Sequence, residues 1–87
     1  MTKLVPATSL AQLMDEIEAG QWTLSGQLSM ISEACLYWKM LNPEQFVASY
    51  DRFEKARQAV RLDATDEEWT ELRSAAAELG AAFRSVA

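Results

Sequence analysis

Four stretches of the chain repeat apolar residues every three or four positions, and none alternates apolar and polar residues at period two. The first spacing places apolar side chains on one face of a helix, whereas alternation is typical of a strand. The pattern predicts an all-α protein with a short N-terminal tail (1–8) and helices at about residues 9–19, 23–41, 43–61 and 66–86. Short connections favour a compact antiparallel bundle, with residues 1–87 forming a single domain.

Capping signals mark several predicted helix ends. Ser9 with Gln12 three residues later fits a capping box, and Gly20 fits the end of the first helix. Thr65 and Glu68 form the same signal before the last helix. We therefore expect the first and last helices to have well-defined ends.

The third predicted helix follows a sharp break in the chain. Pro43 suits the first position of a helix, and Asn42 before it can act as the cap. Further along, Asp51 and Lys55 lie four residues apart and are expected to pair on the polar face.

Each predicted helix also carries an apolar face that should contribute to the core. For the first, third and fourth helices these faces are Leu10, Leu13, Met14 and Ile17; Phe46, Tyr50, Phe53 and Val60; and Trp69, Leu72, Ala76, Leu79, Phe83 and Val86. The second helix has two adjacent apolar stripes, namely Leu24, Leu28, Ile31, Cys35 and Trp38, and then Met30, Ala34, Tyr37 and Leu41. Together they are wider than the ~100° face of an ordinary surface helix, so we expect this helix to be central and covered by at least two neighbours.

Two features of the last helix bear on its role. Gly80 costs about 1 kcal/mol relative to Ala inside a helix, so either the helix ends there or another backbone packs close to it. Residues 75–80 also resemble the helix-to-turn portion of a helix-turn-helix DNA reader, with Ala76 and Gly80 four apart. Too few residues follow for a recognition helix.

Composition narrows the function. The net charge is −5, from 13 acids against 8 bases, which argues against nucleic acid as the main partner. Arg52, Lys55, Arg57 and Arg61 make the third helix the most basic one, but acids are interleaved with them. We find no signal peptide and no membrane-spanning stretch, so we expect a cytoplasmic protein that does not bind membranes. A chain of 87 residues buries little more than ~60% of its unfolded surface, and a homodimer would complete the core.

Catalytic chemistry has little support. The chain has no histidine and a single cysteine, Cys35, which excludes Ser-His and Cys-His nucleophiles and a structural zinc site. Cys35 lies in an apolar stripe, where a thiol is usually buried and inert. The acidic cluster of Asp63, Asp66, Glu67, Glu68 and Glu71 is explained by helix capping. We expect no enzyme, no cofactor and no metal site.

A few residues do not fit a simple core and are the candidates for partner binding. Leu36 and Met40 fall on the polar side of the second helix beside Ser32 and Lys39, so either they are covered by another segment or they form an exposed apolar pair. Arg57 lies within an apolar stripe and either snorkels to water or reaches an acid on a neighbouring helix or a second chain.

The sequence thus favours a non-enzymatic protein-binding module that acts stoichiometrically as a regulator, inhibitor or adaptor. Such small acidic helical proteins are frequent among phage- or plasmid-borne inhibitors, which is an association only. One alternative is a homo-oligomeric assembly component, since the spacing from Trp69 to Val86 would suit pairing with a second copy. A weaker alternative is a helix-turn-helix-like DNA-binding regulator.

Overall fold

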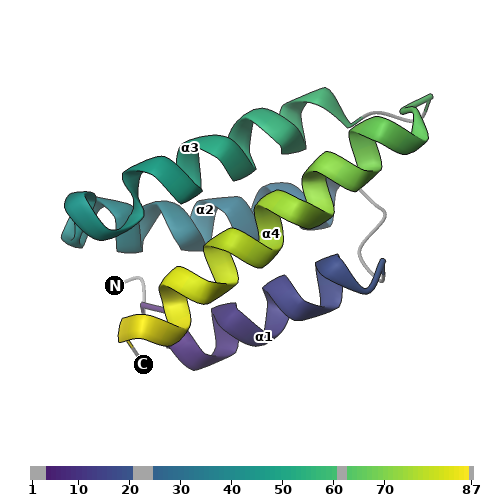
Figure 1. Cartoon of the computed structure of the whole chain (residues 1–87). Helices are drawn as coiled ribbons and strands as arrows, with labels where there is room; N and C mark the ends of the chain where they lie inside the picture. The colour runs from purple at the N-terminus through teal and green to yellow at the C-terminus, as the bar shows by residue number, and fades with distance from the viewer. Residues whose placement is uncertain (1–3, 21–24, 61–62, 87) are drawn as a thin grey trace.

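The computed structural model describes residues 4–20, 25–60 and 63–86. These residues form four helices and no strand: α1 Ala7–Glu18, α2 Ser25–Leu41, α3 Pro43–Ala59 and α4 Asp66–Val86. Successive helices run in opposite directions, and the two ends of the chain lie at the same end of the bundle (Figure 1). The predicted all-α antiparallel bundle is confirmed.

Helix α1 begins two residues earlier than predicted. Pro6 occupies the cap position with a ψ of 144°, and Ser9 lies inside the helix, so the predicted capping box is wrong. Because proline fixes φ near the helical value, the chain enters the helix at Ala7 without a side-chain cap. The end is as predicted. Gly20 has a φ of 84°, a left-handed conformation that glycine adopts readily, and its N–H donates to the Ile17 carbonyl at 2.9 Å.

The boundaries of α2 and α3 depart from the prediction in small ways. The predicted start of α2 at residue 23, with Leu24, lies outside the described residues. Pro43 opens α3 as predicted, and Asn42 takes the cap position, but the Asn42 side chain makes no capping hydrogen bond. Helix α3 ends at Ala59 rather than at 61, because Val60 has extended backbone angles, and the Val60 side chain is still buried.

Helix α4 begins at the predicted capping box. The Thr65 N–H donates to Glu68 Oε1 at 2.9 Å, and the Glu68 N–H donates to Thr65 Oγ at 3.2 Å. The helix then continues through Gly80 without interruption. A Cβ placed at Gly80 would lie 3.1 Å from the Cβ of Met14 on α1. The glycine therefore permits a close approach of α1, which is the second of the two predicted explanations.

The predicted apolar faces of α1, α3 and α4 and the first stripe of α2 supply the core, except that Val86 is exposed and Leu13, Trp38 and Trp69 are only partly buried. Its largest fully buried side chains are Leu10, Met14, Ile17, Leu28, Cys35, Phe46, Phe53, Leu72, Leu79 and Phe83. At one end the Trp38 ring packs edge-on against Phe46 and Phe83, with centroids 6.1 Å away in both cases. Trp38 Nε1 also donates to the Val5 carbonyl at 2.7 Å, which fixes the chain before α1 to α2.

No helix lies at the centre of the bundle: the described helices pack in a ring, each against two others, so α2 has two neighbours as predicted but is not central. Helix α4 packs closely against α1 and α3, whereas α2 packs mainly on α3 and more lightly on α1, and it reaches α4 through the ring contact between Trp38 and Phe83. In Figure 1 α2 lies behind the other helices. Met30, Tyr37 and Leu41, predicted to be core, are exposed. The prediction failed for these residues because α3 and α1 cover the first stripe of α2, and none of the described helices covers the second.

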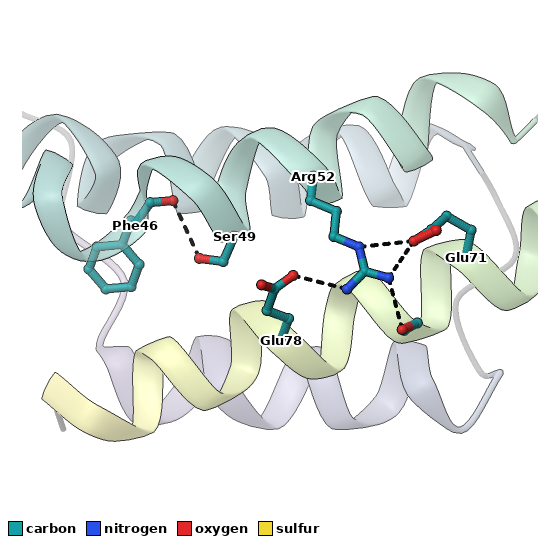
Figure 2. Close-up of polar contacts among 6 residues, drawn as sticks. Phe46, Ser49, Arg52, Glu71 and Glu78 are labelled. Atoms are coloured by element: carbon teal, nitrogen blue, oxygen red, sulfur yellow. Dashed lines mark hydrogen bonds and ion pairs between the residues drawn. The ribbon is translucent and has the colours of Figure 1, made fainter.

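Ion pairs between helices reinforce this packing. Arg52 of α3 reaches two carboxylates of α4, with Nε 2.9 Å from Glu71 Oε1 and Nη1 3.0 Å from Glu78 Oε2 (Figure 2). Asp51 pairs with Lys39 of α2 at 2.9 Å rather than with Lys55, so the predicted pair within α3 is wrong. A neighbouring helix offers Asp51 a cation that the single-helix pattern cannot reveal.

The close approach at Gly80 leads to a stability prediction. Gly80→Leu should destabilise the fold by about 1–3 kcal/mol, because the added side chain would force Met14 away from α4. Ala81→Leu, at the exposed neighbouring position, should change the free energy of unfolding by less than about 0.5 kcal/mol. Urea unfolding of both variants measures this. Equal effects of the two changes would show that α1 does not pack closely there.

Candidate functional site

The largest group of exposed apolar side chains lies on α2. Five residues form what we call the outer face of α2, and their exposed fractions are Met30 74%, Met40 68%, Leu41 63%, Tyr37 38% and Leu36 36%. Their spacing of three, four and seven residues puts them on adjoining rows of one helix. An exposed surface of this kind on a small domain is typical of a binding surface.

Residues at the C-terminal end of α2 and on the neighbouring turns of α3 extend this outer face. Val47 of α3 is 43% exposed and lies one turn before Asp51, which pairs with Lys39 of α2, so Val47 is on the side of α3 nearest to α2. At the C-terminal end of α2 a shallow pocket is lined by Leu41, Asn42, Pro43, Glu44 and Gln45. The apolar surface thus continues across the junction of α2 and α3.

The charges near the outer face are mostly acidic. Glu33 is exposed and lies three or four residues from Met30, Leu36 and Tyr37, so its carboxylate adjoins their side chains. Within the described part of the chain Glu33 has no ion-pair partner. Lys39, the basic residue of α2, faces α3 instead: its Nζ pairs with Asp51 and lies 5.0 Å from the centroid of the Tyr50 ring.

A partly buried polar network joins α2 to α3 on the other side of Leu36. Ser32 Oγ donates to Glu54 Oε2, and Arg57 donates from Nε at 3.0 Å to the same oxygen and from Nη2 to Oε1. Gln58 Nε2 also donates to Glu54 Oε1 at 3.2 Å. The hydrogen bond from Arg57 outweighs the opposing effect of burial and, with the bonds from Ser32 and Gln58, lowers the pKa of Glu54 to about 2.

Cys35 lies near this network and is fully buried. Burial, reinforced by the negative charge of Glu54, raises the pKa of the Cys35 thiol to about 12. At neutral pH the sulfur is therefore protonated, and the thiolate that nucleophilic catalysis needs is not formed.

The five candidates from the sequence divide into two groups. Leu36 and Met40 are exposed on the outer face, which is one of the two alternatives weighed for them. Ser32 and Arg57 lie in the polar network with Glu54, and Lys39 borders it through Asp51. Arg57 neither snorkels freely nor reaches another helix's acid; its carboxylate partner is on its own helix, and Nη1 donates to Ser29 of α2 at 3.3 Å.

The sequence pattern missed several members of this surface. Met30, Tyr37 and Leu41 are predicted core residues that are exposed, and Glu33, a residue of the polar side of the helix, is not among the predicted binding residues. The apolar residues of α2 extend around more than one face, so periodicity alone cannot separate the stripe that faces α3 from the stripe that faces water. Glu33 between apolar neighbours was the signal that the second stripe is not buried, since an unpaired carboxylate is rarely enclosed in a core.

Other chemistry finds little support in the geometry. Helix α4 has no turn at Gly80, so the resemblance to a helix-turn-helix motif does not correspond to the fold. The guanidinium of Arg52 is engaged by Glu71 and Glu78 and that of Arg57 by Glu54. Among the described residues no group of histidine, cysteine or carboxylate side chains is arranged to hold a metal ion. None of the four described helices is long and apolar enough to cross a membrane.

Comparisons with known proteins found no counterpart. No protein-family model, no curated protein and no solved structure matches this chain.

The depressed pKa of Glu54 leads to a pH prediction. Because the pKa falls from 4.5 to about 2 on folding, the carboxylate stabilises the fold above about pH 4.5, and this contribution is lost as the pH falls towards 2. Glu54→Gln should therefore lower the free energy of unfolding by about 1 kcal/mol at pH 7, a modest value because the pair is partly solvated. The difference from the unmodified chain should shrink between pH 5 and pH 2, as measured by urea unfolding. A difference that is constant over this range would contradict the assignment.

The burial of Cys35 leads to a reactivity prediction. In the folded chain the thiol should react with a disulfide reagent at least about 100-fold more slowly than in the urea-unfolded chain, because reaction requires local or global opening. Absorbance of the released thiolate measures both rates. Rapid stoichiometric labelling under native conditions would show instead that Cys35 is accessible and reactive.

Proposed function

We propose that this protein is a non-enzymatic protein-binding module that acts stoichiometrically, as a regulator, inhibitor or adaptor, through the outer face of α2. The observation that carries the proposal is the exposure of five large apolar side chains on one helix of a domain whose core is otherwise well filled. Leaving these side chains in water lowers solubility, and covering them with a partner is favourable by roughly 25 cal/mol per Å² of apolar area buried.

The chemistry of the face also supports protein binding. Met30 and Met40 have flexible, polarisable side chains that adapt to different partner shapes, and they are the two most exposed apolar residues of the face. Tyr37 adds an aromatic ring with a polar end, a residue type enriched at the centres of binding interfaces. The helix itself is held to α3 by the Ser32–Glu54 hydrogen bond and the Lys39–Asp51 pair, so the face is presented on a rigid support.

The alternatives have weaker support. Pairing of two copies through α4 would need its apolar face, but Leu72, Ala76, Leu79 and Phe83 are buried within the chain's own bundle. A DNA-binding role has weaker support because α4 continues through Gly80 without the turn of a helix-turn-helix motif. The net charge of −5 also opposes binding to DNA phosphates. An enzymatic role has weaker support because the chain has no histidine to act as a general base, and the thiol of Cys35 is protonated at neutral pH.

The test compares two variants that add the same charge at different places. Met30→Glu/Met40→Glu changes the outer face, and Thr70→Glu/Ala81→Glu adds the same charge at two exposed positions of α4. Both should remain folded, with free energies of unfolding within about 1 kcal/mol of the unmodified chain. A protein captured from native cells by the unmodified chain is purified, and its binding is measured by calorimetry. We expect a complex of fixed stoichiometry that the α2 variant weakens at least about 100-fold and the control variant retains.

If the α2 variant bound the partner as tightly as the unmodified chain does, the binding surface would lie elsewhere on the protein. Failure to form a stoichiometric complex with any captured protein would contradict the proposed function.

A further inference from the structure

The shape of the outer face of α2 limits what can bind it. It is the side of a helix whose backbone hydrogen bonds are already made within the helix, so it offers no unpaired edge to which a strand could add. From Met30 to Leu41 the face is about 16 Å long, at ~1.5 Å per residue, which is about three helical turns. A second amphipathic helix, with apolar residues repeating at three, four and seven, matches this row of side chains in both length and spacing.

The charges of the face limit the partner further. Glu33 lies among the apolar side chains, and covering them would enclose its carboxylate as well. Enclosing a carboxylate without a counter-ion costs several kcal/mol, so a partner has to bring a cation or a set of donors to this point. Glu44 lines the pocket at the end of α2 beside Leu41 and adds a second negative charge. Lys39 does not offset them, because it is paired with Asp51.

A second copy of this chain is a poor occupant for the same reason. A two-fold symmetric interface uses the same patch on both copies, so it would bring Glu33 and Glu44 of one copy towards those of the other. Among the described residues the outer face includes no cation that could pair with them, and each copy has a net charge of −5. A basic partner would instead bring cations to Glu33 and Glu44. Its positive charge would also be attracted to the net negative charge of this chain, which speeds the encounter.

We propose that the outer face of α2 binds an amphipathic helix of a basic partner protein, whose apolar residues cover Met30, Tyr37 and Met40 and whose Lys or Arg side chains pair with Glu33 and Glu44. This inference rests on the proposed function and specifies the chemistry of the partner. Glu33 is then the residue that selects basic over acidic helices, because an acidic helix would enclose its carboxylate next to like charges.

The test uses synthetic helical peptides of about 18 residues, long enough to form a helix on binding. One peptide has leucines at helical spacing with lysine elsewhere, a second replaces every lysine with glutamate, a third replaces it with glutamine, and a fourth scrambles the lysine peptide to remove its apolar face. Binding is followed by the NMR signals of the methionine methyl groups. Met30 and Met40 report on the outer face, and the buried Met14 is the internal control.

We expect the amphipathic lysine peptide to shift the Met30 and Met40 signals and leave Met14 unchanged, with at least about 10-fold tighter binding than the glutamine, glutamate or scrambled peptide. Glu33→Gln should weaken the lysine peptide about 5-fold. Glu67→Gln should change its affinity less than twofold. Glu67→Gln removes the same charge from the exposed first turn of α4, outside the outer face of α2. Added salt should weaken the lysine peptide most.

Three results would overturn the inference. Equal binding of the glutamine or glutamate peptide would remove the selection for basic partners while leaving the outer face as a docking surface. Shifts of the same methyl signals with protein concentration alone would identify a second copy as the occupant. Absence of binding by every peptide would exclude a generic basic helix, and the proposed function would then be judged by its own calorimetric test.

Discussion

The close approach of α1 to α4 is the contact on which the rest of the arrangement depends. Gly80 leaves room for the Met14 side chain, and the small residues Ala75 and Ala76 on the same helix are fully buried. Large side chains at these positions would keep the neighbouring helices at the usual separation of about 8–10 Å or more. With small ones α1 packs close to α4, and α2 completes the ring of helices by packing on α3 and, more lightly, on α1.

The position of α2 explains both of its faces. One stripe packs on α3 and α1 and contributes Leu28, Cys35 and part of Trp38 to the core. The polar residues beside that stripe are satisfied across the seam, where Ser32 and Arg57 share the carboxylate of Glu54. None of the described helices covers the remaining stripe. The same packing that fills the core therefore leaves five apolar side chains exposed, and this is the physical basis of the proposed binding role.

Much of this fold follows from local sequence signals. The capping box of Thr65 and Glu68, the stop at Gly20 and the break at Pro43 are short-range effects, and all three lie where the sequence predicts them. The start of α1 was misplaced because proline at position 6 enters a helix without a side-chain cap, so Ser9 was not needed. The predicted capping box at Thr65 forms, with reciprocal hydrogen bonds between Thr65 and Glu68. The one predicted at Ser9 does not form, because Ser9 lies within α1 and Pro6 is at the cap position.

The candidate site was harder to predict because it depends on contacts between helices. Leu36 and Met40 stood out as apolar residues on a polar side, whereas Met30, Tyr37 and Leu41 looked like core, since the second stripe adjoins the first. Which stripe is covered depends on where α3 and α1 pack, and no pattern within α2 contains that information. Asp51 illustrates the same limit: Lys55 is nearer in sequence, but Lys39 of α2 is its partner in the fold.

The central claim is that the second stripe of α2 faces water in the isolated chain and is kept for a partner. Oxidation by dilute hydrogen peroxide, followed residue by residue by mass spectrometry, tests it most directly, because the thioether reacts only where peroxide reaches it. We expect Met30 and Met40 to oxidise at nearly the rate of free methionine, independent of protein concentration, and Met14 to be strongly protected. Protection of Met30 and Met40 in the dilute chain would mean that the protein covers this face itself, and that would contradict the account.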